Sequence, residues 1–137
     1  IIPDVPIEEF GDFFKEFDER MDRILLTTPT SDENRIKQID EASSGFVYCV
    51  SVAGITGVRV KFEDLVVENI NRTYKLMDMN KMLIGLGISS KEDIIQLAPY
   101  CDGFIVGSAV INSLTDHVGY GKSFELVRSM REACDEK

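Results

Sequence analysis

The stretch Met82-Leu83-Ile84-Gly85-Leu86-Gly87-Ile88-Ser89 runs from an apolar segment into glycines, and Phe104-Ile105-Val106-Gly107-Ser108-Ala109 repeats the pattern further along. Segments that are apolar throughout are typical of parallel strands covered on both faces. Glycine at a strand end lets an anion approach the backbone, because it has no Cβ. A helix starting at Ser108 would add unpaired N–H groups and the positive end of its dipole. The two strand ends therefore predict a phosphate-binding edge that includes Gly85, Gly87, Gly107 and Ser108.

The rest of the chain alternates short apolar segments with amphipathic helical stretches. The expected strands are Ile1–Ile2, Arg23–Thr27, Phe46–Ser51, Met82–Gly87 and Gly103–Val106. The expected helices are Pro6 to Arg20, a helix beginning at Ser31-Asp32, Phe62 to about Met77, Ser89-Ser90 through Leu97, Ala109 to about Thr115, and about Ser123 to Cys134. Such alternation predicts βα units around a parallel sheet.

Two helices allow more detailed predictions. In the first, the aromatic residues Phe10, Phe13, Phe14 and Phe17 follow helical spacing, and we expect all four in the core. Before the helix that ends near Leu97, Ser89 and Glu92 have the spacing of a capping box.

The sheet could be an open, doubly wound sheet or a barrel. The dinucleotide fingerprint GxGxxG does not follow the first strand. Glycines instead follow the last two strands, where phosphate-binding barrels have them. We therefore expect residues 1–137 to form the C-terminal part of a single α/β domain, a (β/α)8 TIM barrel. Four strands and a stub make about half of such a barrel, and we expect the other half to precede Ile1.

Composition limits the classes of partner. The formal net charge of −9 and the lack of a basic stripe argue against nucleic acid. No apolar run is long enough to span a bilayer, and the first residues do not resemble a signal peptide. The cysteines Cys49, Cys101 and Cys134 are odd in number and lack metal-site spacing, so we expect buried or half-buried thiols in a cytoplasmic protein and no metal.

One further stretch, Tyr48-Cys49-Val50-Ser51-Val52-Ala53-Gly54-Ile55-Thr56-Gly57, joins a buried strand to a glycine-bounded segment suited to a mobile lid. Together with Pro3-Asp4-Val5-Pro6-Ile7-Glu8-Glu9 and the two glycine-containing strand ends, it resembles the α subunit of tryptophan synthase. The order and spacing of all four motifs match along the whole chain. The glycine motifs are shared more loosely with other phosphate-binding barrels, so the first two motifs are the discriminating ones.

The resemblance implies a lyase of tryptophan biosynthesis, which cleaves indole-3-glycerol phosphate to indole and glyceraldehyde 3-phosphate by a retro-aldol reaction. It implies that Gly57, Gly87, Gly107 and Ser108 bind the phosphate, next to Gly85. It also implies that Thr27, Leu86 and Ile105 wall the indole pocket, that Tyr48 contacts the substrate, and that Thr56 bonds an aspartate when the lid closes. Tyr48 and Thr56 would only support catalysis.

The chain departs from the family's usual pattern at three positions. Leu86 replaces a more common Phe, Thr27 a bulkier aliphatic residue, and Val52 a polar or basic lid residue. The family's catalytic glutamate and aspartate come from the second strand and the loop after it, ahead of Ile1, so we expect this stretch alone to be inactive. His117 is better explained as a solvated residue, and Asp4 as a wall or subunit contact.

Cofactor and partners follow from the same resemblance. We expect no cofactor in this chain, because pyridoxal phosphate belongs to the β subunit, with which the family forms an α2β2 heterotetramer. Two alternatives remain open. The chain could belong to another phosphate-binding barrel of amino-acid biosynthesis, or to a non-catalytic barrel that binds and activates a β subunit.

Overall fold

The computed structural model describes residues 1–3, 5–15, 20–51, 63–115 and 120–136. Within them, a four-stranded parallel sheet has the order β1-β2-β3-β4, so each strand pairs with the next one along the chain. The strands are β1 (Leu26–Thr27), β2 (Phe46–Val50), β3 (Lys81–Gly85) and β4 (Gly103–Ile105). The predicted parallel βα arrangement is confirmed, whereas Ile1–Ile2 forms no strand, so that prediction is wrong.

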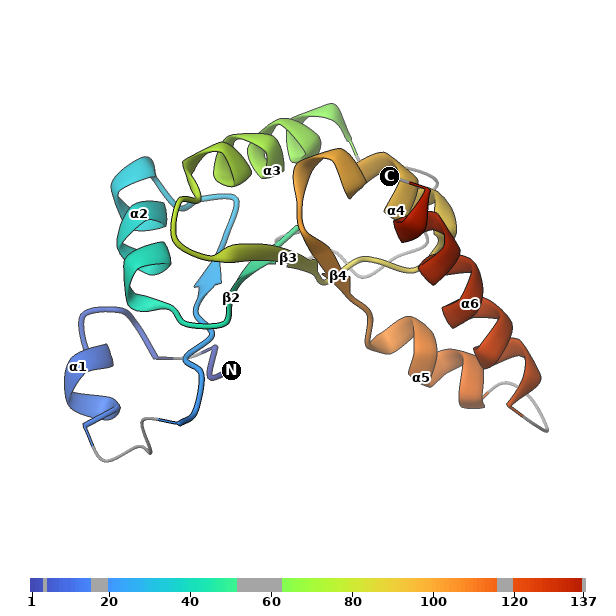
Figure 1. The fold of residues 1–137 in the computed structure, drawn as a ribbon, viewed down its shortest axis with the longest axis horizontal. Helices are drawn as coiled ribbons and strands as arrows, with labels where there is room; N and C mark the ends of the chain where they lie inside the picture. The colour runs from blue at the N-terminus through green and yellow to red at the C-terminus, as the bar shows by residue number, and fades with distance from the viewer. Residues whose placement is uncertain (4, 16–19, 52–62, 116–119, 137) are drawn as a thin grey trace.

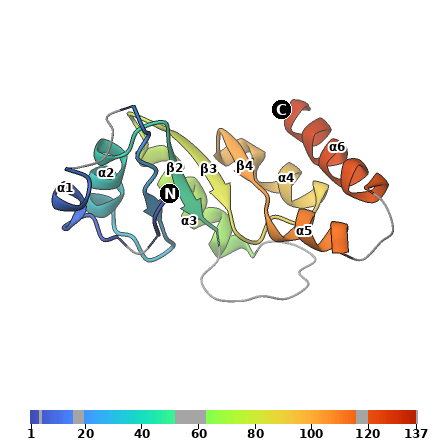
Figure 2. The same cartoon turned by 90° about the horizontal axis from the view of Figure 1, so that it is seen from below.

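Helices connect and cover these strands. They are α1 (Phe10–Phe13), α2 (Glu33–Ala42), α3 (Asp64–Leu76), α4 (Lys91–Leu97), α5 (Ser108–Thr115) and α6 (Gly121–Asp135), with a 3-10 turn η1 at Ala98–Tyr100. Figure 1 shows α2 and α3 side by side along one side of the sheet. Figure 2 shows α4, α5 and α6 grouped beyond β4, with α1 and α2 at the opposite end. No helix among the described residues is both long and apolar enough to cross a membrane.

The two faces of the sheet differ in burial. On β2, Val47 and Cys49 are buried, whereas the alternate residues Phe46, Tyr48 and Val50 are half-buried. Cys49 packs in one core with Ile70 of α3 and with Met82 and Ile84 of β3. We call this the helix side of the sheet, and the face that carries Tyr48 the open side. Alternation along a strand assigns every paired residue to one of these faces.

The α1 region departs from prediction. The helix is one turn long instead of extending from Pro6 to Arg20. Phe10 is buried and packs with Leu25 and Val47, and Phe14 is half-buried against the same cluster. Phe13 is 43% exposed, so its assignment to the core is wrong. Phe17 lies outside the described residues.

The cap of α4 is shifted by one residue from the prediction. Ser90, not Ser89, is the N-cap, and its hydroxyl accepts a hydrogen bond from the Asp93 N–H at 3.2 Å. The Asp93 carboxylate in turn accepts from the Ser90 N–H at 2.9 Å, which completes the capping box. Asp93 also accepts from the N–H of Ser89 at 2.8 Å. This network sets the point at which the chain turns from the end of β3 into α4.

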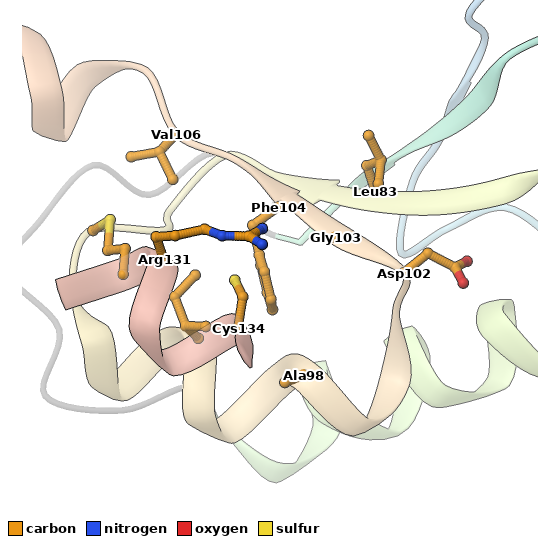
Figure 3. Close-up of a pocket in the computed structure, with 10 residues that line it drawn as sticks. Leu83, Ala98, Asp102, Gly103, Phe104, Val106, Arg131 and Cys134 are labelled. Atoms are coloured by element: carbon orange, nitrogen blue, oxygen red, sulfur yellow. The ribbon is translucent and has the colours of Figure 1, made fainter. Parts of the chain in front are cut away.

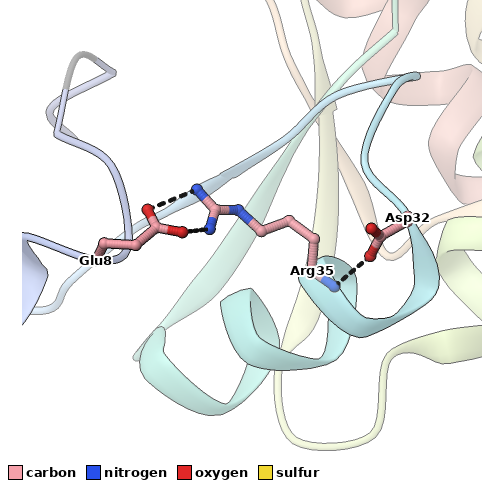
Figure 4. Close-up of polar contacts among 3 residues, drawn as sticks. All are labelled: Glu8, Asp32 and Arg35. Carbon is pink, nitrogen blue, oxygen red and sulfur yellow. Dashed lines mark hydrogen bonds and ion pairs between the residues drawn. The ribbon is translucent and has the colours of Figure 1, made fainter.

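Two carboxylates tie α2 to its neighbours. Asp40, which is buried, accepts hydrogen bonds from the N–H groups of Asp78, Met79 and Asn80, at 2.7, 2.9 and 2.9 Å, and so holds the loop before β3. The Glu8 carboxylate accepts hydrogen bonds from both terminal nitrogens of Arg35, one of them at 3.1 Å (Figure 4). The same figure shows the backbone N–H of Arg35 bonded to the N-cap residue Asp32 at 2.8 Å.

Candidate functional site

The carboxyl ends of β3 and β4 lie next to each other. Gly85 and Ile105 are paired across the two strands, so Leu86-Gly87 and Val106-Gly107 leave the sheet from adjacent positions. Leu86, Gly87, Gly107 and Ser108 are all exposed. The two glycine-containing strand ends are thus brought to one edge, the edge at which parallel barrels bind their ligands.

At the end of β3 the backbone makes a left-handed turn. Leu86 has a φ of 65° and Gly87 a φ of 89°. Glycine adopts such a conformation freely, but a residue with a Cβ does so at a cost of about 1–2 kcal/mol. The Leu86 side chain is 55% exposed, so its packing does little to offset that cost. Other contacts must therefore hold the turn.

Ser51 supplies those contacts, and sequence reasoning assigned it no role. It directly follows β2 and is 1% exposed. Its N–H donates to the Gly85 carbonyl at 3.2 Å, and its hydroxyl lies 3.1 Å from that carbonyl and closer still to the carbonyl of Leu86. The sequence feature that could have indicated this role is a polar residue at the end of an apolar strand, next to a strand that ends in glycine.

The end of β4 leads directly into α5. The Gly107 carbonyl accepts hydrogen bonds from the N–H groups of Val110 at 3.0 Å and Ile111 at 3.1 Å, so Gly107 caps the helix through its backbone. The N–H groups of the preceding helical residues, Ser108 and Ala109, belong to the first turn, where no intrahelical acceptor exists. A Cβ added to Gly107 would meet no atom within 4 Å. The first turn of α5 is therefore open to an anion.

Tyr48 occupies the open side beside this edge. A Cβ placed on Gly85 would lie 2.0 Å from the Tyr48 hydroxyl oxygen and 2.2 Å from the ring carbon that bears it. Gly85 was predicted to leave room for phosphate, but this space is filled by the Tyr48 side chain, which corrects that interpretation. Burial raises the pKa of Tyr48, so its hydroxyl is protonated at neutral pH and can donate or accept a hydrogen bond.

The residues that were expected to wall an indole pocket do not all lie on the same face of the sheet. Ile105 pairs with Gly85 and so lies on the open side with Tyr48. Thr27 pairs with Cys49 and is fully buried, so it faces the helix side, and its prediction as a wall residue is wrong. Its neighbour Leu26, which pairs with Tyr48, lies on the open side and takes that place. Leu86 lies at the exposed turn.

Other predicted residues lie outside the described part of the chain. They are Asp4, Val52, Thr56, Gly57 and His117. Cys49 and Cys101 are buried and Cys134 is half-buried, and none of the three is in a disulfide bond, as predicted. Burial raises the pKa of Cys49 to about 11, against an opposing effect of the Thr27 hydroxyl. Within the described ranges, no three His, Cys, Asp or Glu side chains gather as a metal site would require.

A cavity of about 350 Å³ lies between β4 and the helices α4 and α6 (Figure 3). Phe104 and Val106 line it from the strand side, and Ala98, Met130 and Cys134 from the helices. Arg131 extends across it, and its guanidinium also pairs with Asp135 at 2.9 Å. Neither Tyr48 nor the glycines of the strand-end turn contribute to its lining, so it is separate from the candidate site.

Known proteins share this sequence and fold. Residues 1–135 match the family model described as tryptophan synthase alpha chain. The alpha chain of Rhodopirellula baltica is 43% identical over 124 residues, which are 90% of this chain and 44% of the relative. That of a Thermoanaerobacter species is 44% identical over 124 residues, which are 90% of this chain and 46% of the relative. The chain thus spans about half the length of the curated relatives it matches.

Solved structures lead to the same family. A tryptophan synthase structure from Mycobacterium tuberculosis superposes with a TM-score of 0.79 at 34% identity, covering 96% of this chain and 49% of that one. An Aquifex aeolicus structure superposes with a TM-score of 0.77 at 29% identity, covering 97% and 49%. The parallel βα arrangement is therefore that of about half of a TIM barrel. With the match of the family model over residues 1–135, these similarities show that the chain belongs to the tryptophan synthase alpha chain family.

Proposed function

We propose that the protein to which this chain belongs is a lyase that cleaves indole-3-glycerol phosphate to indole and glyceraldehyde 3-phosphate. The observation that carries the proposal is the pairing of two glycine-containing strand ends at one exposed edge, beside the first turn of α5. Family membership supports this reaction in particular.

In this proposal, backbone N–H groups bind the substrate's phosphate. Gly87 contributes from the turn after β3, and Gly107 and Ser108 contribute from the start of α5. Each charge-assisted hydrogen bond contributes about 1.5–3 kcal/mol, so a few of them suffice without a lysine or arginine. This matters because the chain is strongly acidic, with a net charge of −9. Gly57 would add a further amide from the lid.

The indole would lie on the open side of the sheet. Leu26, Ile105 and Leu86 offer apolar contacts, and the protonated hydroxyl of Tyr48 would touch the substrate close to the reacting carbon. Retro-aldol cleavage also requires a group that protonates the indole ring carbon and one that accepts the glycerol hydroxyl proton. We assign those two steps to a glutamate and an aspartate in the remainder of the protein. Thr56 would bond to that aspartate when the lid closes.

We further propose a β subunit as partner, in an α2β2 heterotetramer in the cytoplasm. Family membership supports such a partner. In that assembly pyridoxal phosphate would belong to the β subunit, and this chain would hold no cofactor.

The phosphate assignment is tested by replacing Gly107 with Val in the full-length protein. Space around Gly107 is open, so the side chain should leave the fold intact and obstruct only the bound anion. We expect the dissociation constant for glycerol 3-phosphate to rise at least tenfold in calorimetry, with an unchanged melting temperature. Gly87→Val should weaken binding too, but the φ of 89° adds backbone strain, so it is the less selective variant. Unchanged affinity in both variants would remove the assignment.

The reaction is tested by measuring indole release from indole-3-glycerol phosphate with and without a β subunit. Indole release that requires the full-length protein supports the lyase. Normal stimulation of the β subunit without any indole release would favour the non-catalytic barrel. Phosphate binding with neither activity would favour another biosynthetic barrel.

A further inference from the structure

We infer that Ser51 is a positioning residue, whose hydroxyl sets the direction in which the Gly87 N–H points and so prepares the phosphate-binding edge. This inference rests on the proposed function. Ser51 is not itself a ligand of the substrate, because it is 1% exposed and its polar atoms are directed at the backbone of β3 and of the turn after it.

The contacts of Ser51 fall on two successive carbonyls. Its N–H continues the sheet by donating to the Gly85 carbonyl. Its hydroxyl, which has one proton to donate, lies within hydrogen-bond distance of the carbonyls of Gly85 and of Leu86. The Leu86 carbonyl lies beyond the last residue of β3, so this side-chain contact extends the link between the two strands into the turn.

Peptide geometry connects this contact to the ligand edge. The Leu86 carbonyl and the Gly87 N–H belong to one planar peptide unit, and the structure contains no cis bond among its described residues. In a trans peptide, the C=O and N–H point in opposite directions. Because Ser51 draws the Leu86 carbonyl toward β2, the Gly87 N–H points away from β2. The strand on that other side of β3 is β4, which leads to Gly107 and Ser108.

The left-handed turn explains why such a contact is needed. Leu86, with its φ of 65°, is in a conformation that its Cβ disfavours. Without the hydroxyl, rotation about the N–Cα and Cα–C bonds of Leu86 would relieve that strain and turn the Gly87 N–H away from the anion. Alanine at position 51 would remove the donor while nearly preserving the volume of the side chain.

The test compares Ser51→Ala with Ser43→Ala in the full-length protein. Ser43 is also buried and also donates its hydroxyl to a carbonyl, that of Ile39 at 2.7 Å, but it lies at the end of α2. We expect Ser51→Ala to raise the dissociation constant for glycerol 3-phosphate about tenfold, equivalent to about 1.4 kcal/mol. In Ser51→Ala the 15N-glycine NMR signal of the Gly87 amide should also shift. In Ser51→Ala the KM for indole-3-glycerol phosphate should rise more than kcat falls. Ser43→Ala should change none of these properties.

The outcomes separate this inference from the proposed function. If the parent protein binds glycerol 3-phosphate and Ser51→Ala binds it equally well, the positioning role is wrong and the phosphate edge stands. If the parent protein does not bind glycerol 3-phosphate, both fail. Should Ser51→Ala not fold, Ser51→Cys is measured in its place, because it keeps a weak donor of similar size. We expect a twofold to fivefold loss of affinity for Ser51→Cys, and an unchanged affinity would again overturn the role.

Discussion

The Tyr48 side chain lies so close to the backbone of Gly85 that it leaves no room for a side chain at position 85. A Cβ there would fall 2.0 Å from the Tyr48 hydroxyl oxygen and 2.7 Å from a ring carbon, so the ring would have to leave its place. Overpacking of this kind costs about 1–3 kcal/mol. We predict that Gly85→Ala lowers the free energy of unfolding of the full-length protein by that amount, measured by urea denaturation, and lowers the rate of indole release.

Removing the ring of Tyr48 should relieve the clash. In the double variant Gly85→Ala/Tyr48→Ala, the loss of stability should be smaller than the sum of the two single losses, since the residues are in contact. Gly11→Ala is the matched control, because a Cβ at Gly11 meets no atom within 4 Å. Additive losses in the double variant would show that the tyrosine ring does not occupy this space.

Asp40 gives the second prediction at the residue scale, a dependence of stability on pH. Burial opposes its ionisation, but the N–H groups of Asp78, Met79 and Asn80 and the Asn80 side chain together lower the pKa of its carboxyl. A lowered folded-state pKa means that Asp40 adds stability above its unfolded pKa of about 3.9. That stability is lost as the pH falls through the lower folded-state pKa.

We predict that Asp40→Asn destabilises the full-length protein by about 2 kcal/mol at pH 7, because the amide replaces a charged acceptor of backbone N–H groups. The difference from the parent protein should shrink in urea denaturation as the pH falls below 4. Asp78→Asn is the control, since Asp78 is exposed and takes part through its backbone N–H only. A difference that stays constant down to pH 3 would show that the Asp40 charge is not responsible.

At the scale of elements, helix α4 starts with a complete capping box. Ser90→Ala removes the acceptor of the Asp93 N–H, and N-cap serines contribute about 1 kcal/mol. We predict a loss of that size in thermal denaturation. Ser89→Ala should cost less, because its hydroxyl contacts the Asp93 side chain, at 3.1 Å, and not a backbone N–H at the start of the helix. The reverse order would return the cap to the position that the sequence pattern indicated.

That one-residue shift illustrates what the sequence could determine at the scale of elements. Strands β2, β3 and β4 were predicted to within about two residues at each end, because apolar runs bounded by glycine identify buried parallel strands. The cap was misplaced because Ser89-Ser90 is followed by Glu92-Asp93, so both pairs satisfy the same spacing. Only the backbone angles decide which serine begins the helix.

The candidate site divides in the same way. The meeting of the two glycine-containing strand ends was predictable, since carboxyl ends of parallel strands share one edge. The position of Thr27 was not, because a strand buried on both faces lacks the polar alternation that would distinguish its sides. Ser51 was missed for a related reason. Its partners are backbone carbonyls of another strand, and these have no signature in the residue types.

On the scale of the whole molecule, the sheet has an edge at β1 and another at β4 within the described structure. Such edges present unpaired N–H and C=O groups to other chains. The cavity beside β4 adds the apolar side chains of Phe104, Val106 and Met130 at one of them. We predict that residues 1–137, produced alone, form oligomers that light scattering coupled to size-exclusion chromatography detects.

The net charge of the chain predicts how oligomer formation depends on salt. At a net charge of −9, electrostatic repulsion between copies opposes association, and salt screens it over about 10 Å at 0.1 M. Raising the salt from 0.02 to about 0.3 M should therefore increase the oligomer fraction if backbone and apolar contacts at the edges drive association. Ion pairs between copies would give the opposite response.

Supplying the rest of the barrel as a second polypeptide should compete with self-association, because it offers partners to both edges. A monomer that melts cooperatively at every salt concentration would show that the four strands satisfy their edges without a partner.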